Sequence, residues 1–127
     1  MVYKGEEQIT MLTNTARASI VQRIAEDMDN GQWGTGTTLW NQTDTSLQSA
    51  IVETKDTLDV KKYSKNVITT VLTTKTSEAN NSYTFAEYTV RGNTDSIIYN
   101  RINYEGFLKT SRYQTDAITT FTVRLVD

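Results

Sequence analysis

The chain has 127 residues, a formal net charge of −2 and a pI near 5.1, and it contains no His, Cys or Pro. Its length suits a single domain, because domains commonly contain about 100–150 residues. Without Cys or His the chain lacks a thiol nucleophile, an imidazole base and the usual ligands of zinc and haem. We therefore predict a protein that is not an enzyme and that holds no cofactor and no metal ion.

Charge and hydropathy exclude further classes of protein. The 13 basic and 15 acidic residues create no positive field for phosphate groups, so we predict no nucleic-acid partner. No apolar run approaches the ~20 residues that cross a bilayer, and no apolar stretch follows a basic head at the amino terminus. We therefore expect no membrane partner, and we expect the chain to be made in a cytoplasm.

The first 30 residues predict an N-terminal arm followed by an amphipathic helix. We place the helix at residues 14–29, with Thr13 or Asn14 as its N-cap and Asn30-Gly31 as its stop. Apolar residues recur at spacings of three or four from residue 9 to residue 28, which puts them on one face of a helix. They are Ile9, Leu12, Ala16, Ile20, Ile24 and Met28.

Residues 31–46 are rich in Gly and Thr and predict a long ordered loop. From residue 47 onward, runs of β-branched and aromatic residues alternate with turn residues, which is typical of antiparallel β structure. The predicted strands are Leu47–Thr54, Asn66–Thr76, Tyr83–Arg91, Ser96–Ile102 and Ala117–Val126, with Asn103–Leu108 as a further candidate. The predicted fold class is α+β, mostly β: one domain, residues 1–127, in which the helix precedes an antiparallel β-sandwich at residues 47–127.

The segment Gly34–Thr38, with the sequence Gly-Thr-Gly-Thr-Thr, has the composition of a phosphate-binding loop but not its pattern. A Walker loop needs a lysine after its last glycine, and none follows here. A dinucleotide fingerprint needs a third glycine where the chain has Leu39. We therefore predict a turn in which the glycines permit positive φ angles.

Acidic residues give two further patterns. The run Asp27–Gly31 resembles part of a calcium loop, but its glycine and the residue at the twelfth position do not fit an EF-hand. Glu87 and Glu105 each lie in a predicted strand among apolar neighbours. Two facing carboxylates could act in hydrolysis, whereas a buried Glu in a small β-protein pairs more often with an arginine such as Arg91 or Arg101.

Two tryptophans flank the Gly/Thr-rich loop. Trp33 and Trp40 could form part of a protein interface, anchor the loop on the core, or stack on sugar rings. Together with Ile9 and Leu12 of the arm and helix, they are our candidate interface residues. We expect the arm, residues 1–12, to extend onto another subunit.

In their order along the chain, these features resemble a family of small tail, tail-fibre-like or head-associated proteins of tailed bacteriophages and related archaeal viruses. The family has a short helix, a Gly-Thr-Gly-Thr-Thr loop, Asp-Thr-x-Leu, a strand with Glu, a strand with Arg, a Lys-Thr pair and a final alternating strand. The matching segments are Gly34–Thr38, Asp44–Leu47, Glu87–Val90, Ile97–Arg101, Phe107–Thr110 and Ala117–Val126. The chain departs from the family in having no Pro in the loop and in carrying Thr89 where the family has Gly.

The resemblance implies a virion component without catalytic activity. It implies a homo-oligomer that also binds other virion proteins, built as a β-sandwich. The alternative is a β-sandwich binding module of the adhesin or carbohydrate-binding type, which would use Trp33, Trp40 or exposed tyrosines.

Overall fold

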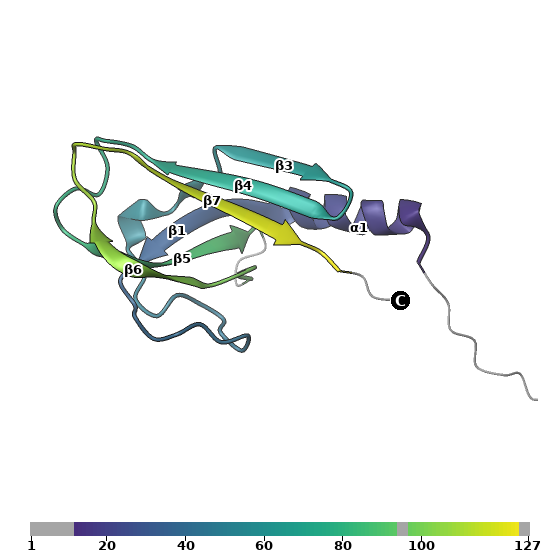
Figure 1. The fold of residues 1–127 in the computed structure, drawn as a ribbon, viewed down its shortest axis with the longest axis horizontal. Coiled ribbons are helices and arrows are strands. Elements are labelled where there is room, and N and C mark those ends of the chain that lie inside the picture. Colours follow the sequence, from purple (N-terminus) through teal and green to yellow (C-terminus); the bar gives the residue numbers. More distant parts are fainter. Residues whose placement is uncertain (1–11, 94–96, 125–127) are drawn as a thin grey trace, which may run out of the picture.

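The computed structural model describes residues 12–93 and 97–124. The described chain is mostly β, with one α-helix and two antiparallel sheets (Figure 1). Its elements are α1 (Asn14–Asp27), β1 (Met28–Gly34), the short 3-10 helix η1 (Val52–Thr54), β2 (Asp56–Thr57), β3 (Val60–Ser64), β4 (Val67–Thr74), β5 (Thr84–Gly92), β6 (Ile102–Leu108) and β7 (Thr115–Thr122).

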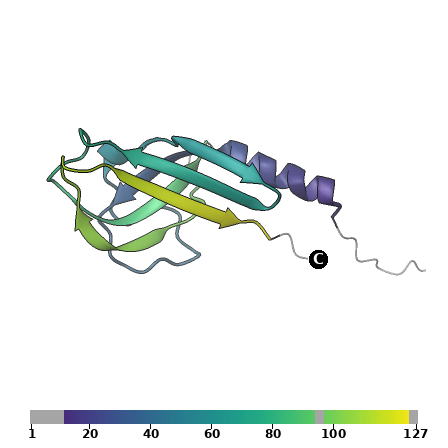
Figure 2. The same ribbon diagram turned by 45° about the horizontal axis from the view of Figure 1, so that its top comes forward.

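Each sheet has its own strand order. One sheet has the order β2-β1-β5-β6 and the other β3-β4-β7. The longest ladder joins β4 to β7, with Val67 opposite Thr122 at one end and Thr74 opposite Thr115 at the other. In Figures 1 and 2, β3, β4 and β7 lie together on one side of the molecule, and α1 projects beyond the strands at one end.

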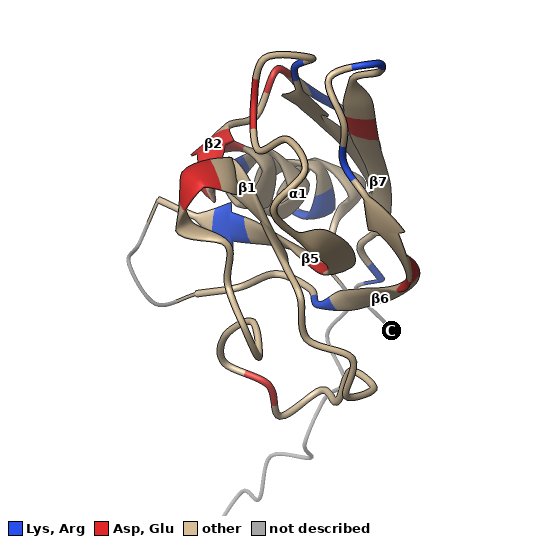
Figure 3. Cartoon of the chain, turned by 90° about the vertical axis from the view of Figure 1, so that its left-hand side faces the viewer, with Lys and Arg blue, Asp and Glu red and all other residues tan. Residues whose placement is uncertain are grey.

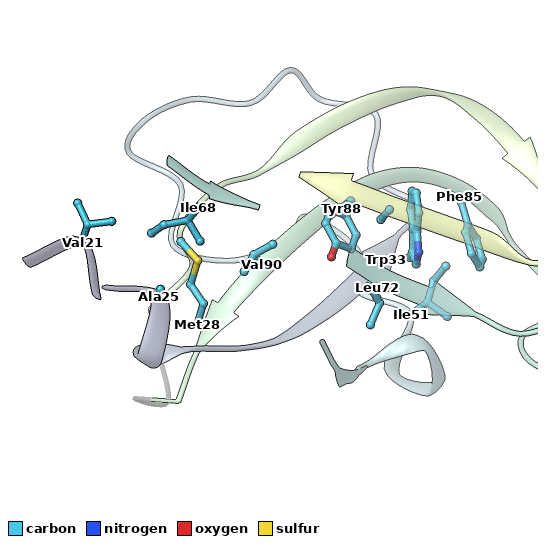
Figure 4. Close-up of a cluster of buried hydrophobic side chains, with 11 residues drawn as sticks. Val21, Ala25, Met28, Trp33, Ile51, Ile68, Leu72, Phe85, Tyr88 and Val90 are labelled. Atoms are coloured by element: carbon cyan, nitrogen blue, oxygen red, sulfur yellow. The ribbon is translucent and has the colours of Figure 1, made fainter. Parts of the chain in front are cut away.

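A single hydrophobic core draws side chains from both sheets and from α1 (Figure 4). At its centre the Trp33 ring stacks on Phe85, with 5.0 Å between centroids, and lies equally close to Tyr88. Aromatic pairs at this spacing contribute beyond the area that they bury. The buried members are Val21, Ala25, Met28, Trp33, Ile51, Ile68, Leu72, Phe85, Tyr88, Val90 and Ala117.

The helix begins where the sequence predicts. Thr13 is the N-cap, and its side-chain oxygen accepts a hydrogen bond from the Ala16 amide at 3.1 Å. The residues that α1 buries are Val21 and Ala25, whereas Leu12 is 46% exposed. Only the C-terminal half of the helix therefore packs on the core.

The predicted helix stop at Asn30-Gly31 is wrong. The helix ends at Asp27, and Met28 leaves it in an extended conformation and begins β1. Gly31 is needed for close packing, because a Cβ there would lie 2.4 Å from the Tyr88 hydroxyl oxygen. The end of the helix is held by Lys61 of β3, whose Nζ donates to the Met28 carbonyl at 2.7 Å.

Four of the predicted strands correspond to observed strands, namely β4, β5, β6 and β7. Two of the predicted strands are wrong. Leu47–Thr54 contains η1 and one isolated bridge. The described part of Ser96–Ile102 forms only an isolated bridge before β6 begins. The predicted loop 31–46 is also wrong at its start, because β1 extends to Gly34. The sequence pattern does not predict β1, β2 or β3. β1 contains no β-branched residue and forms through its partners β5 and β2, and β3 pairs with β4.

We predict that Thr13→Ala lowers the free energy of unfolding by about 1 kcal/mol, because the Ala16 amide then loses its acceptor at the helix N-terminus. Urea denaturation followed by circular dichroism would measure the change. Thr15→Ala, at an exposed helical position, is the matched control and should not destabilise the protein. Equal losses in both variants would contradict the assigned cap.

Candidate functional site

A buried carboxylate holds the Gly/Thr-rich loop in place. Glu87 of β5 is fully buried, and its two oxygens accept hydrogen bonds from three backbone amides. The donors are Gly36 at 2.7 Å, Gln48 at 2.8 Å and Ser49 at 2.8 Å. One carboxylate thus binds both ends of the loop.

Arg101 completes this network from the segment that precedes β6. Its Nε donates to Glu87 at 2.8 Å, and a second guanidinium nitrogen donates to the Thr38 carbonyl at 2.7 Å. The third nitrogen reaches Asp44 at 3.3 Å. The sequence left open whether Glu87 is a hydrolytic carboxylate or pairs with Arg91 or Arg101. In the structure Glu87 forms an ion pair with Arg101.

The two glycines of the loop are explained by close packing. A Cβ on Gly34 would lie 2.5 Å from a Glu87 carboxylate oxygen, and a Cβ on Gly36 would lie 2.4 Å from the same oxygen. No described glycine has a positive φ angle, so the turn predicted from φ freedom is wrong. The glycines leave room for the carboxylate to reach the backbone.

The network determines the charge state of its members. Burial by itself would raise the pKa of Glu87, but the hydrogen bonds from Arg101 and from the loop amides outweigh it and lower that pKa. Burial would lower the pKa of Arg101, and the hydrogen bond and charge of Glu87 raise it instead. Glu87 is therefore a carboxylate whose oxygens already accept several hydrogen bonds, while Glu105 is exposed on β6.

The fixed loop presents two large apolar side chains to solvent. Leu39 is 78% exposed and Trp40 is 60% exposed. The Trp40 amide donates to the side-chain oxygen of Asn103 at 2.6 Å, and the Asn103 nitrogen donates to the Thr38 carbonyl at 3.0 Å. The tip of the loop is thus bound to β6, and the exposure of Trp40 is built into the fold.

A cleft of about 520 Å³ opens beside Trp40. Its walls are the loop around Trp40, the segment before β6 and the middle of β7. Two of the lining residues, Asn100 and Thr119, each have a buried side-chain polar atom without a hydrogen-bond partner in the described structure. Further lining residues are Ile98, Tyr99, Ile102 and Phe121.

The structure separates the four candidate interface residues. Trp40 and Leu12 are exposed, as an interface requires. Trp33 is only 2% exposed, so its prediction as an interface residue is wrong. It belongs to the core instead, because it lies on β1, which has a neighbouring strand on each side. Ile9 lies outside the described residues.

The sequence patterns did not point to a second buried charge. Lys109 is fully buried, and its Nζ donates to the Glu78 carbonyl at 2.9 Å and to the Asn80 side chain at 2.7 Å. Burial lowers the pKa of Lys109. The lysine holds the turn between β4 and β5, and the only signal for it was its place in the Lys-Thr pair.

Asp27 is also explained by the structure. Its carboxylate accepts a hydrogen bond from the Tyr99 hydroxyl, and its carbonyl accepts one from the Asn93 amide. Burial and the Asp27 hydrogen bond raise the pKa of Tyr99 to about 12. The residue that began the calcium-like pattern thus joins the helix end to the segment before β6.

We predict that Gly36→Ala destabilises the protein by about 1–3 kcal/mol, because the added methyl group overlaps the Glu87 carboxylate and the Gln48 side chain. Chemical denaturation would measure this loss. Thr37→Ala, at the exposed neighbouring position, should change stability by less than about 0.5 kcal/mol. A stable Gly36→Ala protein would show that the loop does not need this close approach.

We predict that Glu87→Gln lowers the free energy of unfolding by about 3–5 kcal/mol at neutral pH, because it leaves Arg101 without its buried partner. The folded pKa of Glu87 lies below its unfolded value of about 4.3. The ionised pair therefore stabilises the protein above that pH, and its contribution is lost as the pH falls through the folded pKa.

The gap in stability between wild type and Glu87→Gln should consequently narrow in acid, which urea titrations at several pH values would measure. Glu105→Gln, which changes an exposed carboxylate, is the control and should follow the wild type closely. A gap that does not change with pH would contradict the assigned role of the carboxylate.

Within the described residues, no cluster of three acidic side chains is placed to bind a metal ion, and no helix is long and apolar enough to cross a membrane. The chain matches no protein-family model, no curated protein and no solved structure.

Proposed function

We propose that this chain is a non-enzymatic structural protein of a tailed virus particle, which binds copies of itself and neighbouring head or tail proteins. The observation that carries the proposal is the buried network around Glu87. Four of the segments on which the resemblance rests meet there, through Gly36, Asp44, Glu87 and Arg101.

The chemistry of that network supports a structural role. Its carboxylate is bound by backbone amides and by an arginine, and its glycines make room for the carboxylate. Glu87, Arg101 and the loop glycines therefore have a structural role that does not depend on a substrate. What the network produces is a loop of fixed shape with an exposed tryptophan, which is a feature suited to recognition of another protein.

The wider surface supports the same proposal. Large apolar side chains are exposed on the loop, on the short helix η1 and on strand faces, and exposed apolar groups can form part of protein contacts. The most exposed are Val52, Leu39, Ile118 and Trp40. We also propose that the two sheets form an antiparallel β-sandwich, because side chains from both sheets share one core.

A binding module of the carbohydrate type is the second candidate. It is favoured by one observation, the cleft beside Trp40, where an exposed aromatic ring lies next to the exposed side chains of Asn41 and Gln42. Aromatic rings stack on sugars, and amide and hydroxyl groups can bind sugar hydroxyls.

We predict that the purified protein forms a discrete oligomer, measured by size-exclusion chromatography with light scattering. Trp40→Ala should remain folded, and its binding on a glycan array should be the same as that of the wild type. A monomer that binds glycans, and loses them in Trp40→Ala but not in Leu39→Ala, would overturn the structural proposal in favour of the module.

A further inference from the structure

The outer strands of the two sheets differ in how they are protected against pairing with another chain. Among the described residues, β2 is only two residues long, and β3 carries Lys61 and Lys62. β6 carries Glu105 and Gly106, and its register with β5 is irregular. Short length, charge and irregularity each hinder strand addition.

β7 is regular, and only Asp116, near its start, carries a charge. Its last six residues, Ala117–Thr122, contain no charge, glycine or proline, and four of them are β-branched. In Figure 3 most of this strand is tan, without Lys or Arg. β7 pairs with β4 on one side only, so a regular strand of eight residues has an open edge. Such an edge is a template for a further strand.

The ladder shows which backbone groups point to that edge. The Val123 amide donates to the Asn66 carbonyl at 2.8 Å, and these two residues continue the register of β4 and β7. Backbone groups alternate in direction along an antiparallel strand, so the odd-numbered residues of β7 bond to β4. The amides and carbonyls of Ile118, Thr120 and Thr122 therefore point away from β4.

Side chains alternate in the same way. The even-numbered residues of β7 are exposed on the outer face, with Ile118 at 66%, whereas Ala117 and Thr119 are buried. Directly opposite residues in a sheet have side chains on the same face. A second β7 can therefore pair only in registers that place even-numbered residues opposite even-numbered ones.

One such register is complementary in charge. With Thr120 opposite Thr120, Ile118 lies opposite Thr122, and Asp116 lies opposite Arg124. Asp116 and Arg124 are both exposed, and the two-fold symmetry forms this ion pair twice. A shift that places Asp116 opposite Thr122 loses both pairs.

We propose that the open edge of β7 binds the β7 strand of a second copy of this chain, antiparallel and with Thr120 at the two-fold axis. The two three-stranded sheets then form one continuous sheet across the dimer. The inference rests on the self-association in the proposed function and identifies the surface that would carry it.

The first test places a positive charge at the axis. Thr120→Lys puts two lysines directly opposite each other, and like charges in that position are unfavourable. We expect the dissociation constant of the dimer, measured by light scattering and analytical ultracentrifugation, to rise by about tenfold or more. Ser64→Lys, on exposed β3 at the other edge of the same sheet, is the matched control and should dimerise as the wild type does.

Charge reversal tests the register. Asp116→Arg and Arg124→Asp should each weaken the dimer, because each places like charges opposite each other. The double variant Asp116→Arg/Arg124→Asp should restore it. Weakening without rescue would overturn the proposed register.

Hydrogen exchange gives a readout that does not depend on the size of the particle. In the dimer the amides of Ile118, Thr120 and Thr122 should be protected, and in Thr120→Lys they should exchange rapidly. The amides of Ala117 and Thr119, which bond to β4, should stay protected in both and so report that the variant is folded.

The outcomes separate this inference from the proposed function. An oligomer that Thr120→Lys leaves intact, with unprotected edge amides, overturns the β7 interface while the structural role stands. A protein that is monomeric at all concentrations overturns both.

Discussion

The burial of one carboxylate determines how the loop of this protein is held. Glu87 lies inside the protein, where an ionised group is tolerated only if hydrogen bonds and an opposite charge replace water. Three loop amides and Arg101 supply those contacts. These contacts hold the loop in place, its glycines leave room for the carboxylate, and Arg101 links it to the segment before β6.

Other long polar side chains act on the same principle. Lys61 reaches the backbone at the end of α1, and Lys109 holds the turn between β4 and β5. In each case a lysine on β3 or directly after β6 donates hydrogen bonds to backbone carbonyl groups. A chain without disulfides thereby gains well-defined connections between its strands and loops.

The two surfaces that emerge have different physical characters. The loop with Trp40 is an exposed aromatic group on a rigid support, beside a cleft, and suits recognition through side chains. The edge of β7 offers backbone hydrogen bonds and suits association with an identical strand. The two surfaces adjoin, because Thr120 of β7 also lines the cleft beside Trp40.

The sequence by itself determined the features that depend on local patterns. They include the Thr13 cap, the mostly β class, and the strands β4, β5 and β7, whose residues suit a pleated surface. The sequence also narrowed the partner of Glu87 to two arginines. Only the tertiary structure decides between them. Arg91 is four residues from Glu87 along β5, a separation of about 13 Å, whereas Arg101 lies in the neighbouring segment and contacts Glu87. Tertiary pairing likewise made residues 28–34 a central strand and buried Trp33, since strand formation there depends on distant partners and not on local propensity.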